Sequence, residues 1–565
     1  MNKRSGMKHL LFIACITYTL NIYGQAVSGV LAERIYLQTD KQLYLAGECI
    51  YFKIFTVTPE KKPLSFSKIA YVELLDNADA RVQIKVELTR GVGDGWMELP
   101  LDLPTGYYRL AAYTRFMRNE GETVFFEKTI AVVNTFLPRQ VKYASSDSVA
   151  TVSEHTEQTS NCSLLTDKTT YATREKGMVK LEGLPENIHT LSLSIAGKAP
   201  MTVQENSIIQ WAVQIQAAPA AKPLLKYISE YEGHIISGKI IPLQNPANDA
   251  NNTWIPLLSF TGNHVFLFEG QKDGDNVSFY TTQSAGITEM AITSYGSPES
   301  AYRIDLQSPF AETHEQKQLP VLTGDSIHLD GLLERTVALQ TLSSFTKDSL
   351  TTFRSDDRRF DLNLSKTYIL DEWTRFTEMS DLMIEFISQL RFRRNDEQKR
   401  ELQMLMQQGN DFFWSPTLVV LDGIPIMDHE IIYGYNPLLV ERINIYQQKC
   451  VFGGINFDGI AEFLTYDRKY PGLSIGQSTQ VVVYAGTQPP RLPYSPNYSD
   501  EKNRQSRVPD FRHTLLWEPM LQSKGKSAIE IQFYTSDLTG EFTVTVEGLS
   551  DEGDIIYKTA QFRVR

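Results

Sequence analysis

The sequence predicts a mainly β protein: tandem β-sandwiches, then a small α/β domain and a C-terminal β-unit. Three observations lead to this prediction. Apolar and polar residues alternate in short runs that turn-forming residues separate. One pattern, Thr39–Tyr44 (TDKQLY), recurs as Thr166–Tyr171 (TDKTTY) at an offset of 166 − 39 = 127 residues. That spacing is the size of a domain and exceeds a solenoid repeat of roughly 20–50 residues. Finally, apolar residues at helical spacing precede short apolar strands between residues 366 and 470.

Length and charge limit the possibilities further. A chain of 565 residues exceeds what one hydrophobic core supports, so it contains several domains. Its net charge of −12 and pI near 5.4 argue against a nucleic-acid partner, which requires a basic surface. One basic run lies among acidic residues, and we interpret it as the solvated face of a helix. Its basic members are Arg391, Arg393, Arg394, Lys399 and Arg400.

The N-terminus predicts export. Residues 1–24 carry basic residues before the apolar stretch Leu10–Leu20, which is too short to span a bilayer, and cleavage is expected around Tyr23–Gln25. An alternative interpretation takes Leu11–Cys15 as a lipobox, which would leave Cys15 as the acylated first residue and a possible lipid anchor. We expect no transmembrane span elsewhere, because no other segment is long and apolar enough.

The first folded unit is expected at residues 30–136. Short alternating strands and the tight turn Leu103–Gly106 are typical of a β-sandwich. Here Tyr36–Glu48 and Leu103–Tyr108 resemble the "T-D-K-x-x-Y-x-P-G-E" and "L-P-x-G-x-Y" segments of macroglobulin domains in the alpha-2-macroglobulin family. The resemblance implies an immunoglobulin-like sandwich in which these residues shape turns. Ala46 replaces the usual proline, which loosens one turn.

Two further β units follow. The repeated pattern at Thr166–Tyr171 predicts a second macroglobulin-like domain at 161–216, after a linker at 144–160 rich in Ser, Thr and Glu. A boundary at Ala217–Pro223 separates it from a third β-rich domain at 233–310. Within that domain Asp273–Asn276 is expected to form a hairpin turn rather than a calcium loop.

Residues 366–470 predict a small α/β domain. Leu382, Phe386 and Leu390 share a helical face, and Asp422-Gly423 indicates a tight turn after the strand Leu418–Leu421. In the strand Val440–Tyr446, Ile443 and Ile445 are expected on one face, and Arg442 and Asn444 on an opposite, wetted face. The helix and strands predict a compact layered domain.

Segments of this domain resemble the plug of TonB-dependent receptors. They are Pro416–Ile426, Asn436–Tyr446 and Gly459–Tyr466. A plugged barrel needs about 22 strands of roughly 9–11 residues. Residues 467–565 offer about half the required length, so we expect a plug-like domain without a barrel, followed by a C-terminal β-unit at 477–565. We expect the plug-like domain to pack against that unit or to bind another envelope protein.

No pattern in the sequence indicates a catalytic, cofactor-binding or metal-binding residue, and no cofactor is expected. Gly472–Gly476 matches G-x-S-x-G around Ser474, but a strand follows where a nucleophile elbow needs a helix. Gly525–Ser527 lacks the first glycine of a P-loop. Cys49, Cys162 and Cys450 are expected to be buried, free cysteines, and none lies in the C-x-E-Q thioester motif of protease-trapping macroglobulins. Histidines such as His234, His264, His429 and His513 form no ligand-spaced pair.

Two C-terminal segments complete the resemblance. Arg507–Trp517 and Phe533–Gly540 are similar to signatures of exported proteins of Bacteroidetes-type bacteria that combine macroglobulin-like domains with a barrel-less plug. The resemblance implies a periplasmic or outer-membrane-associated protein of the cell envelope. Our first hypothesis is a non-enzymatic binding or scaffold protein with an envelope partner. An accessory subunit of a TonB-dependent transport complex is the alternative, and a protease-inhibitor-like macroglobulin or an unrecognised enzyme is disfavoured.

Overall fold

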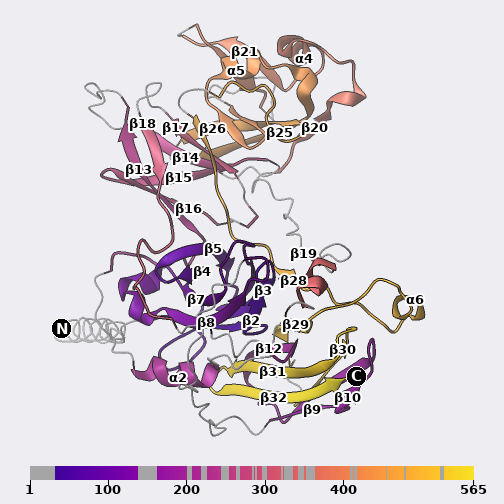
Figure 1. Cartoon of the computed structure of the whole chain (residues 1–565). Helices are drawn as coiled ribbons and strands as arrows, with labels where there is room; N and C mark the ends of the chain where they lie inside the picture. The colour runs from indigo at the N-terminus through magenta and orange to yellow at the C-terminus, as the bar shows by residue number, and fades with distance from the viewer. Residues whose placement is uncertain are drawn as a thin grey trace, which may run out of the picture.

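The computed structural model contains two β-sandwiches, a seven-stranded sheet and an α/β domain (Figure 1). It describes residues 32–137, 162–199, 207–217, 225–243, 254–262, 267–282, 285–286, 289–295, 302–319, 322, 332, 335–341, 349–350, 363–396, 398–406, 412, 417–452, 455–475, 479–521, 523 and 527–565. The expected signal segment, Cys15, the linker at 144–160 and His264 lie outside these residues. The mainly β fold class with sandwiches of immunoglobulin type is confirmed.

The first sandwich occupies residues 34–133 and packs a three-stranded sheet against a five-stranded one. The smaller sheet has the order β1 (Arg34–Thr39), β3 (Cys49–Val57), β6 (Val92–Glu98). The larger has the order β2 (Leu43–Leu45), β8 (Phe126–Val133), β7 (Gly106–Tyr113), β4 (Ile69–Asp76), β5 (Asp79–Glu87). Short 3-10 helices η1 (Phe116–Asn119) and η2 (Glu122–Val124) connect β7 to β8.

The second sandwich combines two segments that are far apart in the sequence. Its first strands are β9 (Ser163–Thr166), β10 (Thr170–Tyr171), β11 (Lys176–Glu182) and β12 (Ile188–Gly197). Its remaining strands are β29 (Thr514–Leu521), β30 (Ala528–Tyr534), β31 (Gly540–Ser550) and β32 (Ile555–Val564). If the eight strands of each sandwich are numbered 1 to 8 in chain order, the two sheets of both sandwiches have the strand orders 1-3-6 and 2-8-7-4-5. Strands expected in two units, 161–216 and 477–565, therefore share one fold, with residues 198–513 inserted between its fourth and fifth strands.

The repeated sequence pattern makes the same hydrogen bonds in both sandwiches. The Tyr44 hydroxyl donates to Asp40 Oδ1 at 2.8 Å, and the Tyr171 hydroxyl donates to Asp167 Oδ1 at 2.6 Å. Asp40 Oδ1 also accepts from the Tyr51 amide at 3.2 Å, and Asp167 Oδ1 accepts from the Met178 amide at 2.7 Å. Tyr51 and Met178 are 127 positions apart, as are the two copies of the pattern. The pattern recurs because each copy ties the second strand to the third, as the turn of a sandwich requires.

Helix α2 (Ile208–Ala217) joins the two sandwiches. Ile208, Trp211 and Ile215 are buried in the hydrophobic core of the first sandwich, which also takes up Leu549 of β31. The rings of Trp211 and Tyr36 have centroids 5.1 Å apart. The residues at 208–217, expected at the end of the second unit, therefore help to join both.

The third unit is one antiparallel sheet. Its order is β18 (Tyr302–Leu306), β13 (Ile235–Pro242), β16 (Asn276–Tyr280), β15 (Leu267–Asp273), β14 (Ile255–Phe260), β17 (Glu289–Tyr295), β27 (Thr479–Val483). The predicted hairpin turn at Asp273–Asn276 is confirmed, with Gly274 at φ 58° between β15 and β16. Strand β27 comes from the expected C-terminal unit, so a second insertion, residues 307–478, lies within this sheet. A two-stranded pairing of β19 (Ser349–Leu350) with β28 (Arg491–Leu492) and the short helix α6 (Glu501–Arg504) complete the connections.

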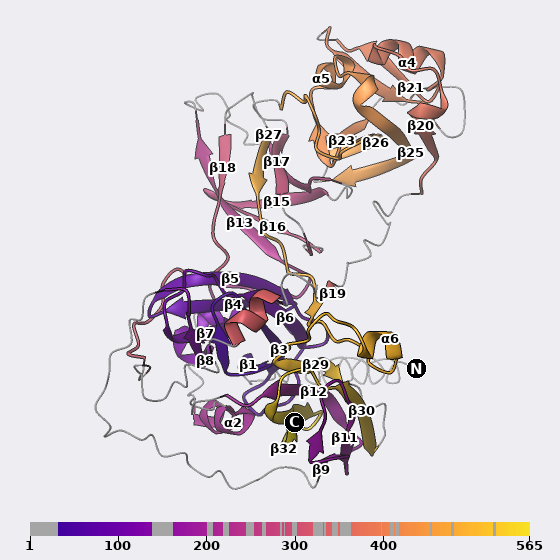
Figure 2. The same ribbon diagram turned by 45° about the vertical axis from the view of Figure 1, so that its right-hand side comes forward.

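The inserted α/β domain lies at the end of the molecule, beyond the third sheet and away from the sandwiches (Figures 1 and 2). Its sheet has the order β20 (Lys366–Ile369), β25 (Val440–Phe452), β26 (Ile455–Thr465), β23 (Leu418–Leu421), β24 (Ile424–Ile426). Around it lie η4 (Leu370–Glu372), α4 (Met379–Glu385), the hairpin β21 (Leu390–Arg394) and β22 (Arg400–Met404), α5 (His429–Tyr433) and η5 (Pro437–Leu439). Asp422 and Gly423 form the predicted tight turn, both at positive φ.

Three expectations for this domain need correction. The predicted helix over Leu382–Leu390 ends at Glu385, because Phe386 leaves helical geometry at φ −149° and Leu390 already begins β21. The basic run Arg391–Arg400 is a hairpin, not a helical face. The face of β25 opposite Ile443 is wetted only in part: Arg442 is half-buried, whereas Asn444 is 3% exposed and donates to Glu462 Oε2 at 2.7 Å.

Candidate binding site

The third sheet covers one face of the α/β domain's sheet. Leu418, Tyr446 and Ile460 pack with Leu267 of β15 and Tyr295 of β17. The Tyr470 hydroxyl donates to Glu289 Oε2 at 2.9 Å, and Val481 of β27 packs against the domain's core. The domain therefore rests on the third sheet rather than on the strands of residues 514–564, and its opposite side, with α4, α5 and the hairpin, faces outward.

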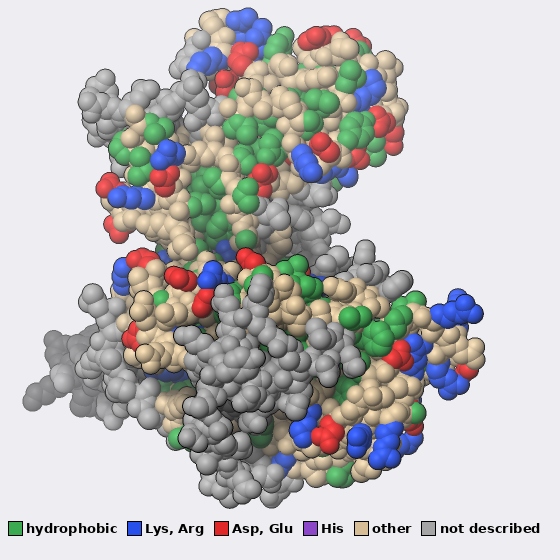
Figure 3. Space-filling view, viewed as in Figure 1, with side chains coloured by type: hydrophobic (Ala, Val, Ile, Leu, Met, Phe, Trp, Pro, Cys, Tyr) green, Lys and Arg blue, Asp and Glu red, His purple; other side chains and the backbone are tan. Residues whose placement is uncertain are grey.

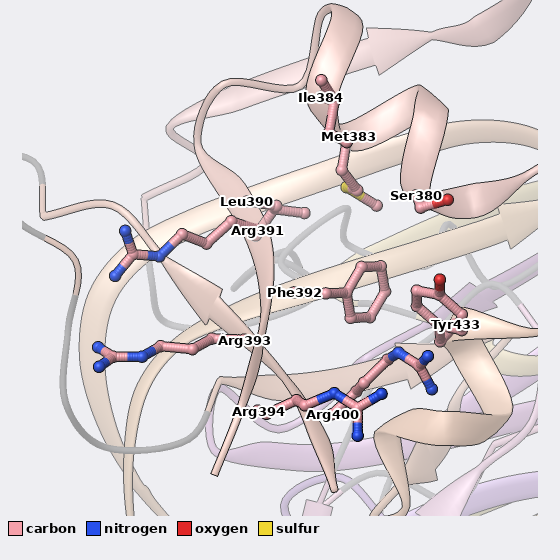
Figure 4. A pocket seen from close by; sticks show the side chains of 10 residues that line it. All are labelled: Ser380, Met383, Ile384, Leu390, Arg391, Phe392, Arg393, Arg394, Arg400 and Tyr433. Carbon is pink, nitrogen blue, oxygen red and sulfur yellow. The ribbon is translucent and has the colours of Figure 1, made fainter. Parts of the chain in front are cut away.

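A pocket of about 330 Å³ opens on that outward side (Figure 4). It lies between helix α4, the hairpin strands and helix α5. Its lining residues are Ser380, Met383, Ile384, Leu390, Arg391, Phe392, Arg393, Arg394, Arg400 and Tyr433. The lining thus contains four arginines and no acidic residue, although the whole chain has a net charge of −12. In the space-filling view, basic side chains gather at the end of the molecule where β21 lies (Figure 3).

The hairpin register divides these arginines between two faces. Phe392 is opposite Leu402, and Arg394 is opposite Arg400, so their side chains share the face toward the pocket. Arg391 and Arg393 belong to the other face and point away from Phe392 and Tyr433 (Figure 4). Arg391 is held there by Gln403 Oε1, at 3.1–3.2 Å from Nη2 and Nε.

Two like charges therefore face each other across the hairpin at Arg394 and Arg400. Such a directly opposed pair is destabilising by itself. Glu430 compensates part of this charge: its Oε2 accepts from Arg400 Nη1 at 2.8 Å, and its Oε1 accepts from the Arg400 amide at 2.7 Å. The Arg400 amide and guanidinium, with Arg394 further off, lower the pKa of Glu430. Arg394 donates to the Gln398 carbonyl at 3.2 Å, so one positive charge remains without a carboxylate in these contacts.

The wall beside these guanidinium groups is apolar and aromatic. The rings of Phe392 and Tyr433 meet edge to face with centroids 5.0 Å apart, and the Arg400 guanidinium lies 4.1 Å from the centre of the Tyr433 ring. Met383 is buried beneath them, whereas Ile384 at the rim is 78% exposed. The pocket therefore offers an apolar surface next to an anion-binding edge.

A second concentration of polar groups lies where the first sandwich meets the third sheet. His234 Nδ1 is 2.8 Å from Glu230 Oε1, and the Tyr71 hydroxyl donates to both Glu230 oxygens at 2.9 Å. His234 Nε2 contacts the Tyr484 hydroxyl, and Lys85 Nζ lies 3.8 Å from the Tyr484 ring centre. Burial lowers the pKa of His234 despite Glu230, and lowers that of Lys85 to about 7. Because these groups satisfy one another, we interpret the cluster as the joint between the two units.

The residues singled out in the sequence occupy separate places. Ser474 is exposed in the loop between β26 and β27. His429 accepts a hydrogen bond from the Leu402 amide at 2.9 Å, and burial lowers its pKa to about 4; burial also lowers the pKa of His513. Cys49, Cys162 and Cys450 form no disulfide with one another, and Cys49 is half-buried rather than buried. Sequence reasoning missed the pocket, although the alternating Arg-Phe-Arg run at 391–393 could have indicated a strand.

The described residues contain no group of three or more His, Cys, Asp or Glu side chains placed to hold a metal ion. None of their helices has both the length and the apolar character needed to cross a membrane.

Comparison with known proteins gives distant structural likenesses. No family model matches the chain, and no curated protein matches it. A mutant Salmonella alpha-2-macroglobulin is 10% identical with a TM-score of 0.23, covering 96% of this chain and 40% of its own. The native Escherichia coli alpha-2-macroglobulin is also 10% identical, with a TM-score of 0.24 and the same coverage. The E. coli adhesin FdeC is 8% identical with a TM-score of 0.14, covering 49% of this chain and 65% of its own. The chain thus spans about two fifths of those two macroglobulins and has bacterial macroglobulins as distant structural neighbours.

Proposed function

We propose that this protein is a non-enzymatic binding protein of the cell envelope that presents its 366–470 domain to a macromolecular partner. The observation that carries the proposal is the nested insertion. The domain is inserted into the third sheet, and the third sheet is inserted into the second sandwich. The domain packs on the third sheet, while its side with α4, α5 and the hairpin faces away from that sheet.

The proposal also draws on the sequence. The basic and apolar start of the chain, residues 1–24, favours export, with acylation at Cys15 as the alternative. Segments such as Pro416–Ile426 resemble a transporter plug, and a plug without its barrel needs another partner for its surface. In this chain the third sheet covers one side of the domain, which leaves the side with α4, α5 and the hairpin for a separate molecule.

Affinity isolation from native envelopes tests the proposal. The full chain, tagged at its C-terminus, should recover a specific partner, whereas a variant with residues 366–470 replaced by a short Gly/Ser linker should not. The hydrophobic cores of the two sandwiches contain no residue from 366–470, so thermal unfolding of the variant should still show folded sandwiches.

Each other outcome would change the proposal in a defined way. Equal recovery with both proteins would contradict it and assign binding to the sandwiches. A recovered TonB-dependent transporter would favour the accessory-subunit function. A native mature N-terminus at Met1 would contradict export, and an acylated Cys15 would identify a lipoprotein.

A further inference from the structure

We propose that the pocket between α4, α5 and the hairpin binds the C-terminal residue of a polypeptide, taking its carboxylate between Arg394 and Arg400 and its apolar side chain on the Phe392–Tyr433 wall. This inference rests on the proposed function and names the chemistry of the partner segment. Three features of the site carry it.

The first feature is the charge of the site. Arg394 and Arg400 face each other across the hairpin, and Glu430 provides the carboxylate for Arg400. An additional anion placed between the two guanidinium groups would relieve their repulsion. A planar guanidinium with several donors matches a carboxylate, which can accept two parallel hydrogen bonds. The pocket therefore selects for an anion at this edge.

The second feature is the position of the apolar wall. Phe392 precedes Arg394 by two residues on the same face of β21, and Tyr433 packs against both Phe392 and Arg400. A ligand must therefore have an apolar group close to its carboxylate, as the last residue of a chain does. A volume of about 330 Å³ lies at the lower end of ligand pockets, which suits one side chain and not a large cofactor.

The third feature is an open strand edge beside the pocket. The amides of Arg400 and Leu402 point away from β21, toward Glu430 and His429. In an antiparallel pair, two residues opposite each other either bond to each other or both point outward. The amides of Arg394 and Phe392, which lie opposite Arg400 and Leu402, therefore point away from β22. Among the described residues β21 pairs with β22 alone, so this edge can accept an extended chain. A free small acid would leave this edge unused, which is why we assign a polypeptide terminus.

Binding of fluorescent heptapeptides to the full chain tests this inference. One peptide ends in phenylalanine with a free carboxylate, a second is its C-terminal amide, and a third ends in glycine with a free carboxylate. We expect the first to bind at least tenfold more tightly than the other two. Equal binding of the acid and the amide would overturn the inference.

Matched substitutions of one arginine inside the pocket and one outside it provide the control. Arg394→Gln should weaken binding of the phenylalanine peptide about tenfold, because it removes the charge and keeps most of the side chain. Arg303→Gln, at an exposed arginine of β18 that does not line the pocket, should leave binding unchanged. Thermal unfolding of both variants checks that the hairpin stays folded, and equal losses in the two variants would overturn the assignment.

Two further measurements separate related possibilities. If N-acetyl-phenylalanine competes as strongly as the heptapeptide, the ligand is a free acid and the polypeptide assignment is wrong. If Arg394→Gln protein recovers the same envelope partner as the unaltered protein, this inference fails while the proposed function stands.

Discussion

The hydroxyl of Tyr36 donates a hydrogen bond of 2.6 Å to Glu547 Oε2, although 511 residues separate them. Tyr36 lies in the first strand of the first sandwich and Glu547 in the seventh strand of the second. Both side chains are buried at the contact between the sandwiches. The contact shows how closely the end of the chain returns to its beginning.

Tyr36→Phe should therefore weaken the contact between the sandwiches. The substitution keeps the ring and leaves a buried oxygen of Glu547 without this donor, which costs roughly 1–3 kcal/mol. We expect a lower urea midpoint for unfolding of the sandwiches. Tyr231→Phe is the control, because Tyr231 is 61% exposed, and its midpoint should not change. Equal midpoints for all three proteins would contradict the prediction.

Arg335→Met should destabilise the docking of residues 335–341 on the first sandwich. Arg335 forms two hydrogen bonds to Glu48, at 2.8 and 2.6 Å, and both side chains are buried. Removing one partner of such a pair costs about 3–5 kcal/mol. Arg303→Met is the control, because the Arg303–Asp305 pair is exposed and contributes little.

The same pair predicts an acid dependence. Burial opposes ionisation of Glu48, but Arg335 and Lys41 outweigh it and lower its pKa to about 2 from 4.5. A carboxylate with a lowered folded pKa contributes stability above the unfolded pKa, which is lost as pH falls from about 4.5 to 2. Urea titrations at pH 6 and pH 3 should show this loss in the native sequence and a smaller loss in Arg335→Met. An equal loss in both proteins would assign the acid dependence to other groups.

Lys53 predicts a dependence on alkaline pH. Its amino group is buried, bonds to Thr190 Oγ1 and donates to the Leu191 carbonyl at 2.9 Å. Burial lowers its pKa to about 7, against the opposing effect of Asp94 and Glu518. Between pH 7 and 10.5 the unfolded chain binds more protons at this site, so the folded state gains stability as pH rises.

Lys53→Met removes this contribution. The free energy of unfolding of the variant minus that of the native sequence should be larger at pH 6 than at pH 9.5. The expected change is on the order of a few kcal/mol, because each unit of pKa shift corresponds to about 1.4 kcal/mol. Lys198→Met, at an exposed position, should show no such difference. A difference of the opposite sign would mean that Lys53 stays charged in the folded protein.

Asp422→Ala should destabilise the α/β domain. Asp422 is fully buried, sits at φ 46°, and accepts from the amides of Thr465 (2.8 Å) and Tyr470 (2.7 Å). Alanine removes these acceptors and tolerates positive φ poorly, for a loss of roughly 3 kcal/mol. Asp422→Asn keeps an acceptor oxygen and tolerates this backbone geometry, so it should lose less. Thermal unfolding of the three proteins checks this order.

Ser474→Ala should change neither the fold nor any binding activity. Ser474 lies in an exposed loop, and surface substitutions usually alter stability by less than about 0.5 kcal/mol. The measurements are partner recovery, thermal unfolding and an esterase screen. An esterase activity of the unaltered protein that this substitution abolishes would contradict a non-enzymatic function.

The sequence by itself determined many of the strands and turns, but not the hairpin at residues 390–404. Alternation of apolar residues predicted strands such as Ile35–Leu37, because one face of a sandwich strand must be buried. Asp422-Gly423 predicted its turn, because the geometry requires positive φ at both positions. The pattern at Thr39–Tyr44 and Thr166–Tyr171 predicted two related sandwiches, because both copies bond the same side chains across one turn.

The tertiary structure alone decided which distant strands pair and which charges meet. The alternating apolar residues of β12 are compatible with pairing to many other strands. That β12 pairs with β29 and β31 depends on the packing of the whole sandwich. Similarly, the run at 391–400 fixes five positive charges in the sequence, but only the hairpin register places Arg394 opposite Arg400 and turns Arg393 away. Local patterns specify which face of a strand is buried, whereas long-range pairing follows from the fit between surfaces that lie hundreds of residues apart.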